Sequence, residues 1–335
     1  MKKIHLFKVL ALFAATLSLS VACNPKEPQN QTQEKLHDDP AKMVVRLVEC
    51  HLHKPWKRVQ ELGGIHQNPP SKGLYLKKIQ EVSYELKAGE GWVLSPKSDK
   101  QFYVRQNVMY QSNGAEEPAP VYLLFIDYYD IKGNLMNGQF IEDGQDHIHR
   151  HFFRPEKVQP AFDGVAEATD NDPTSIIDYL YLDTTPWNKT FHSGEATITG
   201  ATNPIGFKGV IRFLKDRKNF DLRIRLYHGY QSKINPQTGK PDPFYKPGGA
   251  LIQQGTWDVN VTIPVSVLFS NEEFVEVDEE TDPASIPEDS LDDMSNRVLH
   301  SIMHTFNISW EEAIREYIRF IYQVDEIGEA APIWI

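Results

Sequence analysis

The chain has 335 residues, with 35 Lys and Arg against 46 Asp and Glu, so its formal net charge is −11. Binding to nucleic acid depends on cationic contacts to phosphate, and this acidic balance argues against it. Only two cysteines are present, which excludes a disulfide framework. The length is sufficient for two ordinary domains.

The first 22 residues have the layout of an export signal. Lys2 and Lys3 form a short positive region, and an apolar run follows at residues 9–15. That run is only about a third of the roughly 20 apolar residues needed to span a bilayer. We therefore expect residues 1–22 to be a cleaved signal peptide rather than a permanent membrane anchor.

The end of this segment, Leu19-Ser20-Val21-Ala22-Cys23, resembles the lipobox of bacterial lipoproteins, although Ser20 stands where Leu is usual. The resemblance implies that Cys23 is acylated and becomes the new N-terminus, so that the membrane is a partner through this lipid. An ordinary secretory signal is the alternative. Residues 23–40 are polar and rich in Pro, Gln and Asn, which predicts a flexible tether.

Alternating and β-branched segments predict a β domain over residues 41–158. The run at 121–129 is almost continuously apolar, which is typical of a central strand. Cys50 would point away from His51 in a regular strand, so we expect it to be buried. The predicted strands cover residues 43–49, 80–86, 101–110, 121–129, 136–141 and 146–153, and Pro155 is expected to end the last one.

Small, acidic and turn-forming residues at 159–173 predict a linker, followed by a second β domain over 174–270. Its strands, separated by Gly and Pro turns, are expected at 176–182, 194–200, 206–214, 219–228 and 256–269. Strands at such intervals favour antiparallel sandwiches. The predicted fold is mainly β, with two antiparallel β-sandwich-like domains and short C-terminal helices.

The last part of the chain, residues 271–335, changes in character. An acidic, Pro-broken stretch up to residue 293 predicts a loop, and helical spacing follows at 294–306 and 310–324. Ser309 and Glu312 have the spacing of a capping box, in which Ser caps the helix and Glu reaches back. The apolar stripe of the second helix is expected to pack on its surroundings.

Histidines cluster in the first domain. His51 and His53 share one face of a strand, as do His147, His149 and His151, because alternate strand residues point the same way. If the two strands are neighbours, their imidazoles converge. Neutral imidazole is the commonest metal ligand in proteins, and a nitrogen-rich site suits zinc or copper. We therefore predict a Zn²⁺ or Cu²⁺ site formed by His51, His53, His147, His149 and His151, with His66 in reserve.

The other histidines are interpreted differently. His300 and His304 have the i,i+4 spacing of a helical metal site, but no Glu follows His300 as in the metalloprotease pattern His-Glu-x-x-His. We interpret the pair as surface decoration. His228 is in phase with Leu226 and is expected to be a core or edge histidine. No motif of a known enzyme class is present, so we expect binding without catalysis.

Three alternatives remain open. The histidine cluster could hold a metal complex or haem through an axial ligand. Aromatic residues near turns could form a platform that captures a carbohydrate, and the candidates are Trp187, Trp257, Tyr245 and Phe244. The protein could also be a structural adhesion or assembly protein that binds no metal.

Several segments resemble poorly characterised surface lipoproteins of Bacteroidota. They are Asp146-His147-Ile148-His149-Arg150-His151-Phe152-Phe153 with the upstream His51-Leu52-His53, then Asp183-Thr184-Thr185-Pro186-Trp187, and the stretch 199–206. The similarity extends over residues 44–270. It implies an outer-membrane lipoprotein, at the cell surface or facing the periplasm, and a role beside a TonB-dependent outer-membrane transporter. These families carry no settled activity to transfer.

Overall fold

The computed structural model describes residues 37–112 and 115–335. Residues Asp39–Ile335 form one compact unit, separate from Met1–Asp38. The expected signal peptide, Cys23 and all but the last few residues of the expected tether lie outside the described residues. Within the described part of the chain, no helix is both long and apolar enough to cross a membrane.

The larger sheet has seven strands, and every pair in it is antiparallel. The long β1 and β8 lie at its centre, and β2 pairs with the end of β1. The order is β10 (Ile177–Tyr181), β13 (Lys208–Phe213), β8 (Val121–Tyr129), β1 (Lys42–Leu52), β3 (Ile79–Lys87) and β4 (Gly91–Leu94), with β2 (Ile65–Gln67) beside β1.

The second sheet has four strands. Its order is β5 (Phe102–Gln106), β15 (Gly255–Ser270), β14 (Lys218–Gly229) and β9 (His149–Pro160). Only the contact between β5 and β15 is parallel. Two small ribbons complete the strands, β6 (Val108–Ser112) with β7 (Ala115–Ala119) and β11 (Thr184–Thr185) with β12 (Thr197–Ile198).

Short helical turns lie between the strands and in the C-terminal part of the chain. The α-helical turns are α3 (Val59–Leu62), α4 (Pro173–Ile176) and α5 (Gly249–Ile252). The 3₁₀ turns are η1 (Trp56–Arg58), η2 (Asn137–Phe140), η3 (Glu142–His147), η4 (Ala168–Asn171), η5 (Pro283–Ser285) and η6 (Gly328–Ala330).

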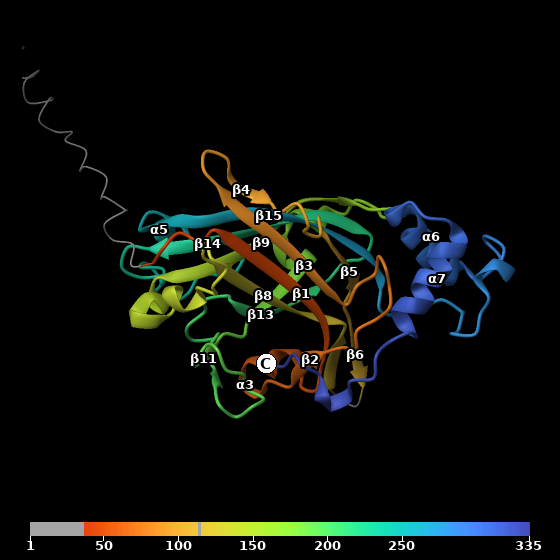
Figure 1. Ribbon diagram of the computed structural model, residues 1–335, viewed down its shortest axis with the longest axis horizontal. Helices are drawn as coiled ribbons and strands as arrows, with labels where there is room; N and C mark the ends of the chain where they lie inside the picture. Colours follow the sequence, from red (N-terminus) through yellow and green to blue (C-terminus); the bar gives the residue numbers. More distant parts are fainter. Residues whose placement is uncertain (1–36, 113–114) are drawn as a thin grey trace, which may run out of the picture. The chain divides into compact units, whose positions relative to one another are not determined.

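The two sheets lie against each other (Figure 1), and one hydrophobic core contains residues from both of them. The larger sheet contributes alternate residues such as Val45 and Ile126, and the smaller sheet contributes alternate residues such as Ile224 and Ile263. Period-two alternation directs one face of each strand inward, and burial of that face holds the two sheets together. The expectation of a mainly β fold with antiparallel sheets and short C-terminal helices is confirmed.

The predicted boundary between two β domains is wrong. β8, from the first predicted domain, pairs with β13 from the second, and β9 pairs with β14 in the same way. Both sheets therefore combine strands from both halves of the chain. The acidic stretch at 159–173 connects strands within one sandwich rather than linking two domains.

Several predicted strands also need correction. The segment 194–200 contains only the two-residue β12, and 101–110 is divided between β5 and β6, which belong to different sheets. The segment 136–141 contains the 3₁₀ turn η2 rather than a strand. β9 begins only at His149 and continues through Pro155 as far as Pro160. Proline removes a backbone donor, which an edge strand tolerates on its unpaired side, and β9 is the edge strand of its sheet.

The C-terminal helices form as predicted. α6 spans Asp293–Phe306 and α7 spans Trp310–Ile321. Ser309 caps α7, because its Oγ accepts a hydrogen bond from the backbone N–H of Glu312 at 3.2 Å. The Glu312 side chain does not complete the box and instead accepts from Arg319 at 2.7 Å. The apolar stripe of α7 packs into a second hydrophobic cluster with α6 and the end of β15.

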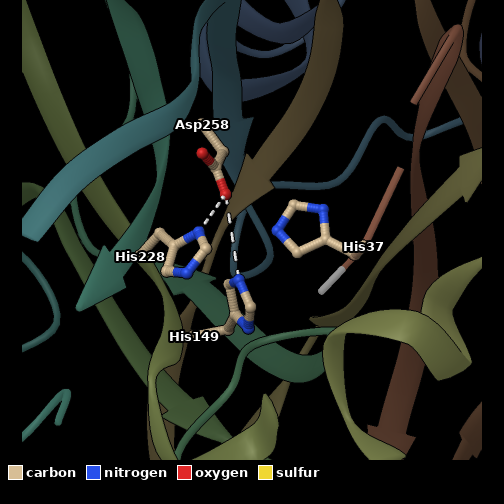
Figure 2. Close-up of side chains that lie close together, drawn as sticks. All are labelled: His37, His149, His228 and Asp258. Carbon is tan, nitrogen blue, oxygen red and sulfur yellow. Dashed lines mark hydrogen bonds and ion pairs between the residues drawn. The ribbon is translucent and has the colours of Figure 1, made fainter. Parts of the chain in front are cut away.

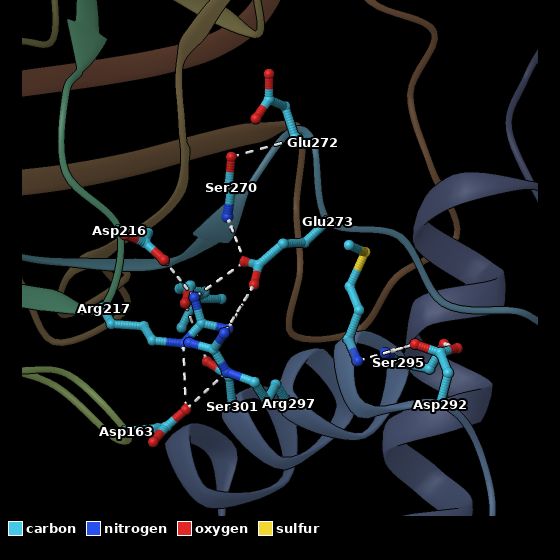
Figure 3. Close-up of polar contacts among 12 residues, drawn as sticks. Asp163, Asp216, Arg217, Ser270, Glu272, Glu273, Asp292, Ser295, Arg297 and Ser301 are labelled. Carbon is cyan, nitrogen blue, oxygen red and sulfur yellow. Dashed lines mark hydrogen bonds and ion pairs between the residues drawn. The ribbon is translucent and has the colours of Figure 1, made fainter.

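A group of ion pairs connects the helices to the four-stranded sheet (Figure 3). Arg217 lies just before β14 and donates to both carboxylate oxygens of Glu273, at 2.9 and 3.1 Å. It also pairs with the neighbouring Asp216. Arg297, on α6, donates to Asp163 at 3.0 Å and lies 3.9 Å from Glu273. The loop after β15 is thereby fixed against the start of β14.

Candidate metal centres

The first candidate site lies where β1 pairs with the short β2. His51 stands directly opposite His66 in this antiparallel pair, and His53 is the first residue after the end of β1. One nitrogen from each of the three rings lies within 4.8 Å of the others. The Nε2 atoms of His53 and His66 are 2.9 Å apart. His66 is buried, His51 is half-buried and His53 is exposed, so the site opens to solvent on one side.

A chain of hydrogen bonds fixes the ring of His51. Asn68 donates through Nδ2 to Glu49 at 2.9 Å, and its Oδ1 lies 2.7 Å from Nδ1 of His51. Burial raises the pKa of Glu49, but the charges of Arg105 and Lys78 outweigh this and hold that pKa below its ordinary value. Because an ionised carboxylate only accepts hydrogen bonds, Asn68 must present its oxygen to His51. His51 therefore carries its proton on Nδ1, and Nε2 keeps the lone pair.

Aromatic stacking holds the rings of this site in place. The backbone of Trp334 forms an antiparallel bridge with that of His66, and the indole stacks on the imidazole with a centroid distance of 4.1 Å. His192 stacks on the other side of Trp334 with a centroid distance of 3.7 Å. Stacking covers the faces of an imidazole and leaves the ring nitrogens, which bind metals in the ring plane, at the edge.

The second candidate site lies on the inner face of the four-stranded sheet (Figure 2). His149 on β9 stands opposite His228 on β14, and their ring centroids are 4.3 Å apart. Oδ2 of Asp258 lies 3.0 Å from Nδ1 of His228 and 3.8 Å from Nε2 of His149. All three side chains are buried or nearly so. His37, which Figure 2 also draws, belongs to Met1–Asp38, outside the folded unit.

A β-bulge explains how Asp258 reaches this face. Leu226 pairs with Val259 but Tyr227 pairs with Trp257, so Asp258 is the extra residue on β15. Val259 lies in the inner core, whereas Trp257 packs on the outer face with Tyr227. A bulge re-aims side chains in this way. Strict alternation along β15 would place Asp258 on the outer face, so the sequence pattern alone does not identify it.

The five histidines predicted as one site do not converge. β1 and β9 belong to different sheets, so His51 and His53 gather with His66, and His149 gathers with His228. His147 ends the 3₁₀ turn η3 and its side chain is 74% exposed, so it lacks the predicted strand geometry.

His151 also stands apart. Its Nε2 accepts a hydrogen bond from the Tyr128 hydroxyl at 2.9 Å, and its Nδ1 donates to the carbonyl of Ile205 at 2.9 Å. Burial lowers the pKa of His151 to about 4. The residue is a neutral part of the core.

The remaining candidates have ordinary structural roles. Nε2 of His300 lies 2.7 Å from Oδ1 of Asp289 near the surface. The ring of His304 stacks on Phe162. Cys50 is buried as expected, with its Sγ donating to the carbonyl of Val48. Burial raises the pKa of its thiol, so it remains protonated.

The aromatic residues considered for carbohydrate binding do not form one platform. Phe244 packs against the inner core, and Trp257 packs on Phe152 under the guanidinium of Arg225. Trp187 donates to Glu142. The face of Trp257 is therefore used by a contact within the protein, and the indole N–H of Trp187 is used by a hydrogen bond.

Three histidine-containing groups in the folded unit could hold a metal ion. They are His51 with His53 and His66, His149 with His228 and Asp258, and His300 with Glu288 and Asp289, whose two carboxylates are exposed at the surface. In comparisons with known proteins, no family model, no curated protein and no solved structure matches this chain.

Proposed function

We propose that this protein binds a transition-metal ion, Zn²⁺ or Cu²⁺, through His51, His53 and His66. The observation that carries the proposal is the gathering of three imidazole nitrogens within 4.8 Å at the solvent-exposed end of β1. A site with three nitrogen ligands suits zinc or copper, and a fourth position remains for water or another ligand.

The spacing of the nitrogens supports this ion class. Zinc binds imidazole nitrogen at about 2.0–2.1 Å, so two ligands of a tetrahedral site lie about 3.3 Å apart. The Nε2 atoms of His53 and His66 are 2.9 Å apart. At this distance they share one proton, and a metal ion would take the place of that proton after a small movement of the rings.

The surroundings of His51 support the proposal independently. Metal-binding histidines commonly donate their second N–H to an oxygen, which fixes the tautomer and orients the ring. Asn68 does this for His51 and is itself held by Glu49. The unprotonated Nε2 is thus prepared for coordination before an ion arrives.

The accessibility of the site favours uptake and release. His53 is exposed, so an ion can enter without unfolding of the sandwich. On a chain anchored through lipid at Cys23, such a site would collect metal near the outer membrane and transfer it to a neighbouring transporter. This localisation and this partner are parts of the proposal.

Metal analysis of the full chain purified in detergent tests the proposal. Zn²⁺ affinity is measured by calorimetry after removal of bound metal. Loss of a residue that only orients a metal ligand lowers metal affinity by about 10–100-fold. Loss of a ligand itself, in His51→Ala or His53→Ala, should therefore lower Zn²⁺ affinity by more than about 100-fold. Asn68→Leu should lose about 10–100-fold. His147→Ala, which changes an exposed histidine outside the cluster, is the matched control. Unchanged affinity in the two His variants with an intact fold would overturn the proposal.

A further inference from the structure

The buried group at His149, His228 and Asp258 offers a different set of donor atoms. It supplies two imidazole nitrogens and one carboxylate oxygen, all within 4.8 Å of one another. Two histidines and one carboxylate form a common set of ligands for Fe²⁺, Mn²⁺ and Zn²⁺ in proteins, with the remaining positions open. This combination differs from the three imidazoles of the first site.

We infer that His149, His228 and Asp258 form a second metal site, selective for a divalent ion that accepts mixed nitrogen and oxygen ligands. The site shares no residue with the first one. It does not depend on the proposed function, and each site can fail without the other.

The geometry suits direct coordination. The distances from Asp258 Oδ2 to the nitrogens of His228 and His149 are 3.0 and 3.8 Å. Adjacent ligands at about 2.1 Å from an ion are separated by about 3.0 Å in an octahedral site and 3.4 Å in a tetrahedral one. An ion between the three side chains requires only small side-chain movements.

Hydrogen bonding also prepares His149. Its Nδ1 lies 2.9 Å from the carbonyl oxygen of Gln145, which can only accept. The neutral ring therefore has its proton on Nδ1 and its lone pair on Nε2, the atom that faces Asp258 (Figure 2). This is the pattern in which a backbone carbonyl orients a metal-binding imidazole.

Burial and charge add a further argument. The Asp258 side chain is only 4% exposed, and its Oδ2 forms ion pairs with both histidines. A metal ion bound at the same point would be strongly attracted by this carboxylate, because the interior has a low dielectric constant. The β-bulge that turns Asp258 inward places the carboxylate beside both rings.

The test uses the full chain, stripped of metal and then titrated with Mn²⁺ and with Zn²⁺. Mn²⁺ is followed by its paramagnetic resonance signal, and bound Zn²⁺ is counted by elemental analysis. We expect about two Zn²⁺ per chain in the wild type and about one in Asp258→Asn or His228→Ala. Mn²⁺ binding should be lost in both variants and retained in His53→Ala.

The matched control is His151→Gln, which changes a buried histidine on the same face of β9 that lies outside the group. A second measurement, thermal unfolding, distinguishes loss of the metal site from loss of the fold. Mn²⁺ at 100 times its Kd should raise the Tm of the wild type by about 4 °C and leave that of Asp258→Asn unchanged.

Two outcomes would overturn the inference. One is unchanged Mn²⁺ binding in folded Asp258→Asn. The other is a single Zn²⁺ in the wild type that disappears in His53→Ala, which would leave only the first site. Loss of metal in Asp258→Asn but not in His53→Ala would instead support this site and overturn the proposed function.

Discussion

At the scale of single residues, His151 shows how burial decides the role of a histidine. It lies in the same strand as His149, two residues away, but its ring nitrogens are occupied by the Tyr128 hydroxyl and the Ile205 carbonyl. Burial lowers its pKa to about 4 from an ordinary value of 6.5. The ring is therefore neutral in the folded protein at pH 7.

This shift predicts a loss of stability in mild acid. Between pH 6.5 and 4 the unfolded chain binds a proton at this residue and the folded chain does not, so the free energy of unfolding decreases as the pH falls. Across the whole window the loss is about 3 kcal/mol, and about 2 kcal/mol is expected by pH 5.

Replacement of the ring isolates this contribution. In His151→Gln, urea unfolding of the metal-free protein at pH 7 and pH 5 should give a difference about 2 kcal/mol smaller than in the wild type. Glutamine can still accept from Tyr128 and donate to Ile205, so the packing is largely retained. If the two proteins lose the same free energy between these pH values, His151 is not the group responsible.

The sequence predicted part of each candidate site. The His51-x-His53 spacing gave a shared strand face, and the structure adds His66 through the register of β1 with β2. Asp258 could not be found by alternation, because a bulge changes the face on which it lies. His147 was misplaced because Asp143 and Gly144 adopt positive φ angles of 53° and 81° and end the regular backbone there. That Asp-Gly pair is a turn signal.

At the scale of elements, Arg217 at the start of β14 and Arg297 on α6 meet at the same two carboxylates, Asp163 and Glu273 (Figure 3). Arg217 and Arg297 both lie near Asp163 and Glu273, but their side chains are 3% and 52% exposed. Breaking a buried ion pair leaves a charge without compensation, whereas an exposed pair is screened by water. The two arginines therefore form a matched comparison.

We predict that Arg217→Ala lowers the free energy of unfolding by about 3–5 kcal/mol. Arg297→Ala should lower it by no more than about 1 kcal/mol. Urea denaturation followed by far-UV circular dichroism measures both. Equal losses in the two variants would show that burial of Arg217 does not set the strength of this connection.

Strand positions were mostly predictable, because alternation is a local property. The strand at 121–129 was predicted with the bounds that β8 has in the structure. The extension of β9 through Pro155 was not predictable, because a strand accepts proline most readily where one of its sides is unpaired, as at a sheet edge. Edge position depends on the whole sheet order, and no local pattern contains it.

At the scale of the whole molecule, the order of strands in space departs from their order in the sequence. β5, β8 and β9 come from the first half of the chain, and each pairs with a strand from the second half. The inner core is likewise built from both halves. The division of the chain at 159–173 was predicted from local composition. It does not exist in the fold, because the strands on its two sides pair with one another.

The interleaving predicts that neither half folds alone. A fragment of residues 41–158 retains β1, β3 and β8, but β5 and β9 lose β15 and β14, so the four-stranded sheet cannot form. The inner face of β1 and β8 would then be exposed to water, and no other sheet would cover it. Far-UV circular dichroism and urea unfolding of this fragment should show no cooperative transition, whereas residues 39–335 should show a single one. Because the two sheets share one core, mixing fragments 41–158 and 159–335 should restore the transition. A cooperative transition in 41–158 alone would mean that the first half has a core of its own, as the sequence alone had suggested.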